Sequence, residues 1–591
     1  MTSNSRKLYV TVLFLTAVQL ASAAAPANGY LVHNLVADQP GIADFTDPNL
    51  VNPWGFATSA TSPFWLTDGG TGLSTVYSSN GTPSATKPSV PPSAKGTTPS
   101  TPTGIVYNGT GGFLVQGKVP SFIFVTADGA LSAWASAVSA TQAQLMVDNS
   151  GSGAVYYGLA ISATTTNAAP LLYAANFASG NIDVFDTNFK PVPMPGAFVD
   201  ASVPAGYAPF NIQNVAGKLY VMYAKQNAAK NFATLGAGLG YVAIFDLSGN
   251  LIKHLASNGP LNAPWGVAVA PSTFGTFASD VLIGNFGDGT INAFDPNTGN
   301  ALGALQDQNG NTIANPGLWG LIVGNGGSGG DANAVYLLAG GATQKHGVLA
   351  SIQASPTITS VSNAADIQSG IAQNTFISLY GANLAPITRN WTNSDFAGTK
   401  LPTSLDGVSV TVNGKAAYVY YISPKQIDVL TPVDTTTGTV QVVVTDNGLA
   451  SNSLSATMQP YSPAFFLFKD GKSIAGLHAN GGIVGATTLY PGLSTPAQSG
   501  ETVGLYAAGL GQTTPAIADG TIITTTPSPC ATLPTATVGG APAQVAYCAL
   551  IGVGLYQVNV TVPAGTPSGD NIVVITIGTL SSNSNAVVTV Q

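Results

Sequence analysis

The chain has 591 residues, of which 7% are charged, 45% are hydrophobic and 69 are glycine. Its 17 Lys and Arg residues stand against 25 Asp and Glu residues, which gives a net charge of −8. Because its Lys and Arg residues form no cluster, we do not expect the chain to bind nucleic acid or anionic lipid. Its length predicts two to four domains, and its apolar content is too high for a disordered protein.

The first residues have the pattern of a secretory signal peptide. Arg6 and Lys7 form a positive region, residues 8–20 are mostly apolar, and Ala21-Ser22-Ala23 is a small-residue cleavage site. A membrane anchor is the alternative, but the apolar stretch is short for a span of ~20 residues. We therefore expect residues 1–23 to be a signal peptide, no later transmembrane span, and a secreted or cell-surface protein.

A glycine, usually next to an aromatic or bulky residue, recurs at a nearly constant interval through the first part of the chain. One interval is double the others, and a degenerate copy at 209–211 fills it. Short alternating strands and turns of Gly, Asn and Asp accompany each copy, as is typical of a β-propeller. Six copies predict a six-bladed propeller over residues 29–352. The glycines are Gly55, Gly104, Gly158, Gly266 and Gly320.

Two blades depart from the repeat. The fourth carries an insertion at 226–238, and the sixth lacks an outermost strand before the chain leaves at Ser355-Pro356. A spare strand at 30–36 follows the predicted cleavage site. We expect it to supply the missing strand, because closing a ring with the start of the chain removes exposed sheet edges.

After a linker at 353–358 the period disappears and a second repeat begins. Residues 375–384 match 502–510, and residues 410–419 match 536–545, at a nearly constant offset. Short strands with turn signals predict two immunoglobulin-like β-sandwich units, at 359–460 and 461–591. The whole chain is thus predicted to be all-β.

The two cysteines, Cys530 and Cys548, lie in the second of these units. In an exported chain a single local disulfide is the natural interpretation, and it would contribute ~3 kcal/mol. A pair of buried free thiols is the alternative.

Each region resembles a known family. The motifs at 52–55, 102–106, 127–129 and 182–186 resemble an uncharacterised family of secreted bacterial six-bladed propellers of the NHL-like group. Residues 362–365, 380–385 and 421–427 resemble the C-terminal module of many secreted acidobacterial proteins, which is similar to IPT/TIG-type immunoglobulin folds. The first resemblance implies a fold without an assigned activity. The second implies a role in display, spacing or attachment.

One set of residues predicts a metal site. Asp68, Asn176 and Asn285 occupy equivalent positions at the end of the second strand of blades 1, 3 and 5. Three oxygen-bearing side chains about 120° apart would converge on the axis and suit Ca²⁺ or Mg²⁺. Six-bladed hydrolases of the gluconolactonase-like group hold a divalent metal in a similar way. The alternative is that all three are turn residues, because Asn and Asp cap local backbone groups.

The same face should carry Trp54, Trp265 and Trp319, each of which precedes a repeat glycine. Aromatic rings beside polar amides suit a sugar-like ligand, so these residues are the predicted ligand-binding set. The alternative is that each tryptophan is a packing wedge between blades.

No catalytic motif accompanies these features. The four histidines are scattered, and the sequence has no Gly-x-Ser-x-Gly elbow and no zinc-type His-x-x-x-His. We interpret each histidine as a surface or strand residue. The favoured function is a non-enzymatic, monomeric binding or surface-display protein that recognises a polysaccharide or another cell-surface component. A metal-dependent extracellular hydrolase or lyase at the axis, and a structural protein of an envelope or matrix, are the alternatives. The histidines are His33, His254, His346 and His478.

Overall fold

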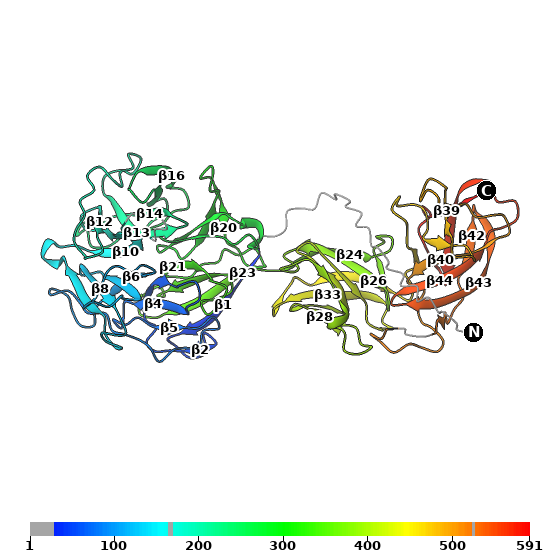
Figure 1. Ribbon diagram of the computed structural model, residues 1–591, viewed down its shortest axis with the longest axis horizontal. Coiled ribbons are helices and arrows are strands. Elements are labelled where there is room, and N and C mark those ends of the chain that lie inside the picture. The colour runs from blue at the N-terminus through cyan, green and yellow to red at the C-terminus, as the bar shows by residue number, and fades with distance from the viewer. Residues whose placement is uncertain (1–28, 163–168, 523–525) are drawn as a thin grey trace. The chain divides into compact units, whose positions relative to one another are not determined.

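The computed structural model describes residues 29–162, 169–522 and 526–591 (Figure 1). Within these residues the chain consists of strands and loops with three short 3-10 helices and no α-helix, so the all-β prediction is confirmed. The helices are η1 (Ser150–Ser152), η2 (Gly275–Phe277) and η3 (Asn393–Asp395). The chain divides into two compact units, one that ends at Ser355 and one that begins at Pro356.

The predicted signal peptide, residues 1–23, lies outside the described residues. In the part of the chain that the structure describes, no helix has the length and apolar character needed to cross a membrane.

Six sheets make up the first unit, and we call them blades 1 to 6 in chain order. Blade 1 contains β3 (Pro53–Ala57), β4 (Phe64–Asp68) and β5 (Val76–Tyr77), and blade 2 contains β6 (Pro102–Tyr107), β7 (Phe122–Thr126), β8 (Ala130–Trp134) and β9 (Gln144–Asp148). Blade 3 contains β10 (Tyr156–Ile161), β11 (Leu172–Asn176) and β12 (Asn181–Phe185), and blade 4 contains β13 (Tyr207–Val215), β14 (Lys218–Lys225), β15 (Gly240–Phe245) and β16 (Leu251–Ser257). Blade 5 contains β17 (Pro264–Val269), β18 (Val281–Asn285), β19 (Ile291–Phe294) and β20 (Ala301–Ala304), and blade 6 contains β21 (Leu318–Val323), β22 (Val335–Ala339), β23 (Val348–Ala354), β1 (Tyr30–Ala37) and β2 (Phe45–Thr46).

The inner strands of these blades form a closed ring. They are the first strands in the sequence of each blade, β3, β6, β10, β13, β17 and β21, and each contacts its two neighbours, with β21 contacting β3. The ring closes through the start of the chain, because β1 pairs antiparallel with β23 and becomes the strand outside it. The expected closure strand is therefore confirmed, and the first unit is a β-propeller.

The repeat glycines allow the inner strands to approach one another closely. A Cβ atom on Gly55 would lie 2.6 Å from the carbonyl oxygen of Thr103 in blade 2, and one on Gly266 would lie 2.5 Å from that of Trp319 in blade 6. The pairing register also shifts near the start of every inner strand, which marks an irregularity of the β-bulge type at the glycine or its equivalent. The regular recurrence of glycine therefore records a packing requirement of the ring.

Blade 4 satisfies the same contact without a glycine. Asn211 stands at the equivalent position, and its Nδ2 donates a hydrogen bond of 2.7 Å to the carbonyl oxygen of Trp265 in blade 5. In blade 5 the corresponding approach is made by Gly266 toward the carbonyl oxygen of Trp319. In other blades a glycine lets the strand approach the equivalent carbonyl oxygen of the next blade. In blade 4 the side-chain amide of Asn211 binds that oxygen instead, which explains why this copy of the repeat has no glycine.

The second unit contains two halves with separate cores. The first half has one sheet of β24 (Thr357–Asn363), β26 (Phe376–Ala382), β32 (Gln426–Leu430), β31 (Tyr418–Ile422) and β27 (Arg389–Asn390). Its other sheet has β25 (Gly370–Ala372), β35 (Leu454–Gln459), β33 (Gly438–Asp446), β29 (Val408–Val412) and β28 (Ser404–Leu405), with β30 (Lys415–Ala416) and β34 (Leu449–Ala450) at its sides. Aliphatic side chains from both sheets fill the space between them.

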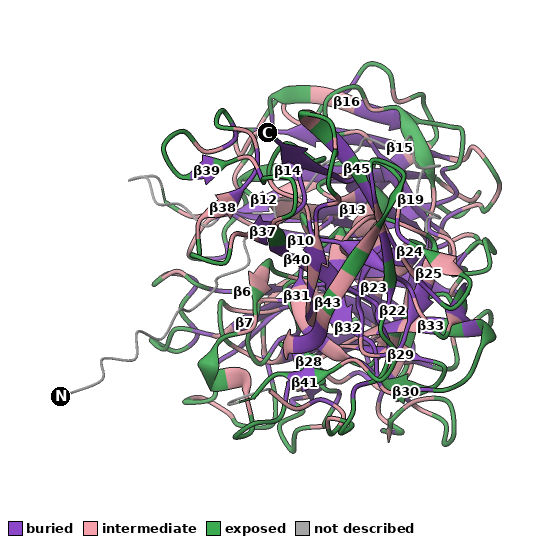
Figure 2. Cartoon of the chain, turned by 90° about the vertical axis from the view of Figure 1, so that its right-hand side faces the viewer, coloured by how far each residue is buried: buried purple, intermediate pink, exposed green. Residues whose placement is uncertain are grey.

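The strands of the second half form one connected sheet that folds around its own core. It contains β36 (Ala464–Phe465), β37 (Gly476–Leu477), β38 (Ile483–Val484), β39 (Ser494–Thr495), β40 (Thr502–Ala508), β41 (Ser528–Pro529), β42 (Thr535–Val538), β43 (Ala541–Gly552), β44 (Leu555–Thr561), β45 (Gly569–Ile577), β46 (Leu580–Ser581) and β47 (Val587–Val590). The long strand β43 pairs with β42 near its start and with β44 beyond it, so it links the two layers. The β40–β44 pair repeats the β26–β32 pair of the first half, as the internal sequence match predicts. Figure 2 shows how buried residues follow the strands while exposed residues gather in the loops.

A segment of the second half is tied to the first half by hydrogen bonds. The N–H of Leu401 donates to the carbonyl oxygen of Gly520 at 2.9 Å, and the N–H of Val433 donates to Oδ2 of Asp519 at 3.1 Å. Because these contacts join the halves, residues 356–591 are one compact unit. The predicted boundary between residues 460 and 461 stays a prediction.

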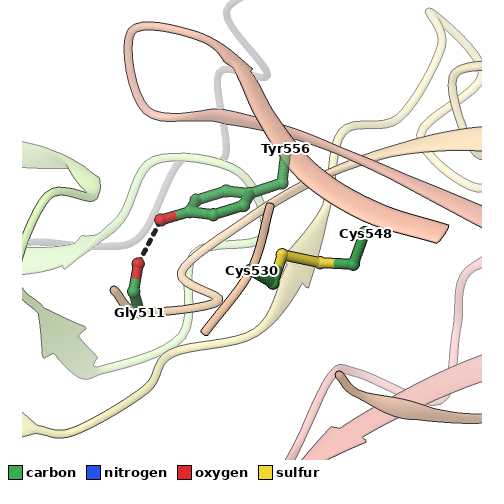
Figure 3. Close-up of a disulfide and its surroundings, with 4 residues drawn as sticks. All are labelled: Gly511, Cys530, Cys548 and Tyr556. Carbon is green, nitrogen blue, oxygen red and sulfur yellow. Dashed lines mark hydrogen bonds between the residues drawn. A yellow bond between two sulfur atoms is a disulfide. The ribbon is translucent and has the colours of Figure 1, made fainter. Parts of the chain in front are cut away.

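Cys530 and Cys548 form the predicted disulfide, with 5.4 Å between their Cα atoms (Figure 3). Cys548 is buried in the core of the second half. Close to the bond, the hydroxyl of Tyr556 donates to the carbonyl oxygen of Gly511. The disulfide prediction is confirmed, and the bond fastens β41 and its flanking loop to β43.

Candidate functional site

The tryptophans before the repeat glycines meet at the centre of the ring. The rings of Trp54 in blade 1 and Trp319 in blade 6 stack with 3.4 Å between their centroids, and Trp265 in blade 5 meets both edge-on. Tyr157 in blade 3 stacks on Trp54 at 5.2 Å, and Phe210 in blade 4 contacts Trp319 at 5.9 Å. Blades 1 and 3, 1 and 5, and 4 and 6 are not neighbours, so these contacts cross the axis. Aromatic rings therefore fill the centre of the ring on this side.

The predicted ligand-binding tryptophans are all members of this aromatic plug. Trp54, Trp265 and Trp319 are 2%, 3% and 0% exposed. Rings this deeply buried contact one another and not the solvent, which favours the packing role that the sequence left open. The structure brings the three together as expected, and it places their indole faces inside the protein.

Asp68, Asn176 and Asn285 are equivalent in the structure, because each is the last residue of the second strand of its blade. Each is also held within its own part of the ring. Oδ2 of Asp68 accepts a hydrogen bond of 2.8 Å from the hydroxyl of Thr75, and Nδ2 of Asn176 donates to Asp183 at 2.9 Å. The Nδ2 of Asn285 donates to the carbonyl oxygen of Pro260 at 2.7 Å.

Burial raises the pKa of Asp68 well above its usual range, which favours the protonated carboxyl in the protein without a metal. The described residues contain no group of three or more His, Cys, Asp or Glu side chains that could hold a metal ion. Binding of Ca²⁺ or Mg²⁺ by the Asp68 set stays a prediction.

Next to the plug the propeller has a cavity of about 310 Å³, which we call the axial cavity. Loops of three successive blades form its walls: the insertion of blade 4, the β18–β19 turn of blade 5, and two loops of blade 6. These loops adjoin the starts of the inner strands, so the cavity lies on the face where the sequence placed the recognition surface. The lining residues are Phe232, Ala233, Leu235, Phe286, Gly287, Asp288, Pro316, Gly317, Gly341, Ala342 and Gln344.

Two phenylalanines form an apolar corner in the axial cavity. The ring of Phe286 stacks on Trp319 with 4.0 Å between centroids and 20° between planes. The ring of Phe232 stands nearly perpendicular to Phe286, at 5.4 Å and 88°. The aromatic plug thus supports the floor of the cavity, while Leu235, 48% exposed, belongs to its rim.

Asp288 and Gln344 are the polar side chains that line the axial cavity. Asp288 is exposed, and its Oδ1 accepts hydrogen bonds from the N–H and the hydroxyl of Thr290, at 3.0 Å and 2.7 Å. Its Oδ2 accepts one from Nδ2 of Asn262 at 3.1 Å. No Lys, Arg or His is among the lining residues, so the one formal charge of the described lining is negative.

The insertion of blade 4 is anchored near both of its ends. The Nε2 of Gln226 donates to the carbonyl oxygen of Phe177 in blade 3 at 2.6 Å. The hydroxyl of Tyr157, also in blade 3, donates to the carbonyl oxygen of Asn231. At its other end the N–H of Gly236 donates to Oδ1 of Asn262 at 2.8 Å. The sequence predicts this insertion, but no sequence pattern indicates that Phe232 and Asp288 line a common cavity. The only available signals were the added length and the Phe-Gly-Asp-Gly turn.

Each of the four histidines contacts a carboxylate, and Nε2 of His478 also lies 3.0 Å from both the hydroxyl and the carbonyl oxygen of Thr495. His254 lies 2.6 Å from Asp200, and His478 lies 2.5 Å from Glu501. His33 and His346 pair with Asp44 and Asp38 at 3.0 Å and 2.9 Å. These contacts fit histidines that support loops and strands.

Comparison with known proteins gives one domain and one set of relatives. Residues 356–461 match the IPT/TIG domain, so the expected IPT/TIG fold of the first half is confirmed. The chain is 34% identical over 301 residues to uncharacterized protein R648 of Acanthamoeba polyphaga mimivirus, covering 49% of this chain and 72% of that protein. It is 31% identical over 300 residues to uncharacterized protein L690 of the same virus, covering 49% and 78%. These relatives are viral, so they lend no support to the expected bacterial family.

Solved structures of propeller proteins are similar at a lower level. Virginiamycin B lyase from Staphylococcus aureus aligns with a TM-score of 0.32 and 9% identity, covering 68% of this chain and all of that one. The PQQ-bound aldose sugar dehydrogenase from Streptomyces coelicolor aligns with a TM-score of 0.33 and 12% identity, covering 56% and all of that chain. Likeness at this level carries no information on activity.

Proposed function

We propose that this chain, which belongs to the family of the mimivirus proteins R648 and L690, is a binding protein. Its propeller is the recognition domain, and its IPT/TIG-containing unit spaces or attaches that domain. A propeller joined to an IPT/TIG domain suits a binding or scaffold role, because both folds act as platforms for partners. The ligand site of the proposal is the axial cavity.

The observation that carries this proposal is the closed axis with an open cavity beside it. The rings of Trp54, Trp265 and Trp319 occupy the centre, and the cavity next to them is lined by several loops. Loops on a rigid scaffold that form a concave and mostly apolar surface with a few polar groups are typical of small-molecule sites.

The alternative function, a metal-dependent hydrolase or lyase at the axis, needs polar ligands that converge there. The plug instead places apolar rings at this position, and Asn176 and Asp68 bind neighbours in their own blades. A structural role in an envelope or matrix is compatible with the same fold, and it requires no ligand in the cavity.

We further propose that the protein works outside the cytoplasm. The Cys530–Cys548 disulfide supports this location, because structural disulfides persist in oxidising compartments. Amino-terminal sequencing of the natural protein tests the proposal. A chain that begins after Ala23 in an extracytoplasmic fraction is the expected result, and an intact leader in the cytoplasm contradicts it.

The recognition function is tested by thermal-shift and calorimetric screening of the full chain against neutral sugars, acidic sugars, amines and divalent cations. A ligand present at 100 times its Kd raises the stability by ~2.7 kcal/mol. We expect at least one organic ligand to do so, and Ala342→Trp, which adds a large side chain to the lining of the axial cavity, to abolish the effect. Ala237→Trp, on the insertion of blade 4 but outside the cavity lining, is the control for added bulk at this face, whereas Ala342 lies in the loop between β22 and β23. Stabilisation by Ca²⁺ or Mg²⁺ with turnover of a substrate would instead favour the enzyme, and a silent panel would favour the structural role.

A further inference from the structure

We infer that the propeller binds a calcium ion between Asp47 and Asp68, and that this ion fastens blade 1 to the strands that close the ring. The inference goes beyond the proposed recognition function, because the axial cavity takes no part in it. It also differs from the axial metal set of the sequence prediction, because Asn176 and Asn285 supply no ligand.

The two carboxylates come from the two sides of the ring closure. Asp47 follows β2, which pairs with the closure strand β1 of blade 6, and Asp68 is the last residue of β4 in blade 1. Both residues are buried, and neither belongs to an ion pair among the described residues. Burial raises the pKa of Asp68, and the charge of Asp47 adds to this effect. Two buried carboxylates repel each other, so a proton or a metal ion has to offset their charge.

One oxygen of Asp68 lacks a partner in the protein chain. Its Oδ2 accepts hydrogen bonds from the N–H and the hydroxyl of Thr75, at 3.2 Å and 2.8 Å. Its Oδ1 is buried and accepts no hydrogen bond from any described residue. Leaving a buried acceptor without a partner is costly, so this oxygen points to a ligand other than the protein chain.

The equivalent residues of blades 3 and 5 show which way such an oxygen faces. Oδ1 of Asn176 accepts a hydrogen bond of 3.3 Å from the N–H of Val155. Oδ1 of Asn285 accepts one of 3.1 Å from the N–H of Asn262. Both N–H groups lie just before the inner strand of the blade, whereas each Nδ2 binds a residue on the side of the third strand. Because Oδ2 of Asp68 binds on that side as well, its Oδ1 faces the loop before β3.

The loop before β3, residues 47–52, offers this oxygen a carboxylate where the other two blades offer an amide. The N–H of Asn49 donates to Oδ1 of Asp47 at 2.9 Å, and those of Asp47 and residues 50–52 donate to carbonyl oxygens. The N–H groups of the loop therefore have other acceptors than Asp68. A hard cation is the ligand that two carboxylates can share.

Tyr77 lies beside both carboxylates. Its hydroxyl donates to Oδ2 of Asp47 at 2.9 Å, which leaves a lone pair on that oxygen. Burial raises the pKa of Tyr77 well above its usual range, and the charges of Asp68 and Asp47 add to this effect. The phenol therefore stays protonated, and the hydroxyl oxygens of Tyr77 and Thr75 are neutral ligands next to the two charged ones.

The burial of the site favours calcium over magnesium. Mg²⁺ keeps several water molecules in a strict octahedron, whereas Ca²⁺ accepts irregular shells of carboxylate, hydroxyl and carbonyl oxygens. Asp68 is 0% exposed and Asp47 is 9% exposed, so the protein and not bulk water has to supply most of the ligands. Extracellular calcium modules work with a Kd of ~10⁻⁴–10⁻³ M, which fits a site with two carboxylates.

The test is isothermal titration of the full chain with CaCl₂ after divalent ions have been removed with EDTA. We expect one Ca²⁺ to bind with a Kd on the order of 10⁻⁴ to 10⁻³ M, and Mg²⁺ to bind more weakly. At ten times the Kd, calcium should raise the melting temperature of the propeller by about 2 °C.

Asp68→Asn should abolish calcium binding and the thermal shift. The variant should fold, because Asn176 and Asn285 carry the same amide at the equivalent positions. Asp47→Asn should weaken calcium binding by about tenfold or more through the loss of one charged ligand, and it gives the same test if Asp68→Asn fails to fold.

Asn176→Ala is the matched control, because it changes the equivalent position of blade 3, and it should bind calcium as the wild type does. Calcium binding that Asn176→Ala abolishes would place the ion at the axis and overturn the inference. Binding that survives both Asp68→Asn and Asp47→Asn would overturn the site. A wild type that binds no calcium would also overturn it, and a higher melting temperature of Asp68→Asn would then identify a protonated carboxyl. Each of these outcomes leaves the recognition function standing, because that function is tested at the axial cavity.

Discussion

The propeller and the IPT/TIG-containing unit bury their apolar residues in different ways. In the propeller, aromatic side chains from blades that are not neighbours meet at the axis, as Trp54 does with Tyr157 and Trp265. In the second unit each half has its own aliphatic core between strands. A central plug leaves the loops of several blades around one point, and the result is a cavity of about 310 Å³. At the seam between the two halves a cavity lined by Leu430 and Asp519 has only about 20 Å³.

A ligand site can arise more readily in the propeller than in the sandwich. In a propeller the loops of several blades meet near the axis, above a rigid layer of packed side chains. In a β-sandwich the inward side chains instead fill the space between the two sheets. Substitutions can test whether the stability of the propeller depends on close backbone contacts between blades. They can also test whether the stability of the second unit depends on its disulfide and its local hydrogen bonds.

The largest effect is expected for Gly266→Val in the propeller. Its Cβ would lie 2.5 Å from the carbonyl oxygen of Trp319, a backbone atom that cannot move without shifting blade 6. We expect a loss of about 3 kcal/mol or more, because overpacking against backbone forces the strands apart. Calorimetry should show a lower transition for the propeller. Gly111→Ala, where nothing lies within 4 Å, is the control. An unchanged transition for Gly266→Val would refute the close-packing account.

The disulfide variant Cys530→Ser/Cys548→Ser should destabilise the second unit and leave the propeller unchanged. The sequence separation of the cysteines is 18, and closing a loop of that length restricts the unfolded chain by ~3 kcal/mol. Calorimetry with and without a reducing agent measures the effect. The wild type should lose stability on reduction and the double variant should not. A shift in the propeller transition would show that the two units are coupled.

Asn211→Ala tests how blade 4 replaces its glycine. The substitution leaves the carbonyl oxygen of Trp265 without the 2.7 Å hydrogen bond in a buried position. We expect a loss of ~1–2 kcal/mol in propeller stability, as for other unsatisfied buried acceptors. Chemical denaturation of the full chain measures it. A neutral result would mean that Asn211 only occupies space.

The smallest effect concerns pH and Asp366 in the first half of the second unit. Burial raises the pKa of this carboxyl to about 6, although its hydrogen bonds with Gln368 oppose the change. Because the folded-state pKa lies above the unfolded value near 4, stability is fully present below pH ~4 and is lost as the pH rises through 6. We expect this unit to be ~1–2 kcal/mol more stable at pH 4 than at pH 7 from this group.

Asp366→Asn should abolish that part of the pH dependence and raise the stability at pH 7. Melting curves between pH 4 and pH 7, with the propeller transition as an internal reference, measure both changes. An unaltered pH profile in the variant would show that folding does not raise the pKa of this carboxyl.

Much of the fold could be predicted because its signals are local. The repeat glycines, the spare strand at the start of the chain and the two cysteines each report a constraint that one residue or one strand must satisfy. Gly55 and Gly266 recur because a neighbouring backbone leaves no room for a side chain. The β1–β23 pairing follows from a missing strand in blade 6.

The candidate site could be predicted only in part. The sequence placed the tryptophans and the Asp68 set on one face of the ring, but spacing carries no information on whether a ring points inward or outward. Phe232 comes from an insertion and Asp288 from a turn in the next blade, and no pattern joins them.

The β-propeller, its closure by β1, the internal repeat of the second unit and the disulfide follow from residue spacing, because spacing sets both the periodicity and the pairing of strands. That Trp54, Trp265 and Trp319 fill the axis, and that the open cavity lies beside them, becomes evident only in the folded protein. The reason is physical: burial depends on all six blades at once, and contacts between blades that are far apart in the chain choose which aromatic residues are covered and which line a surface.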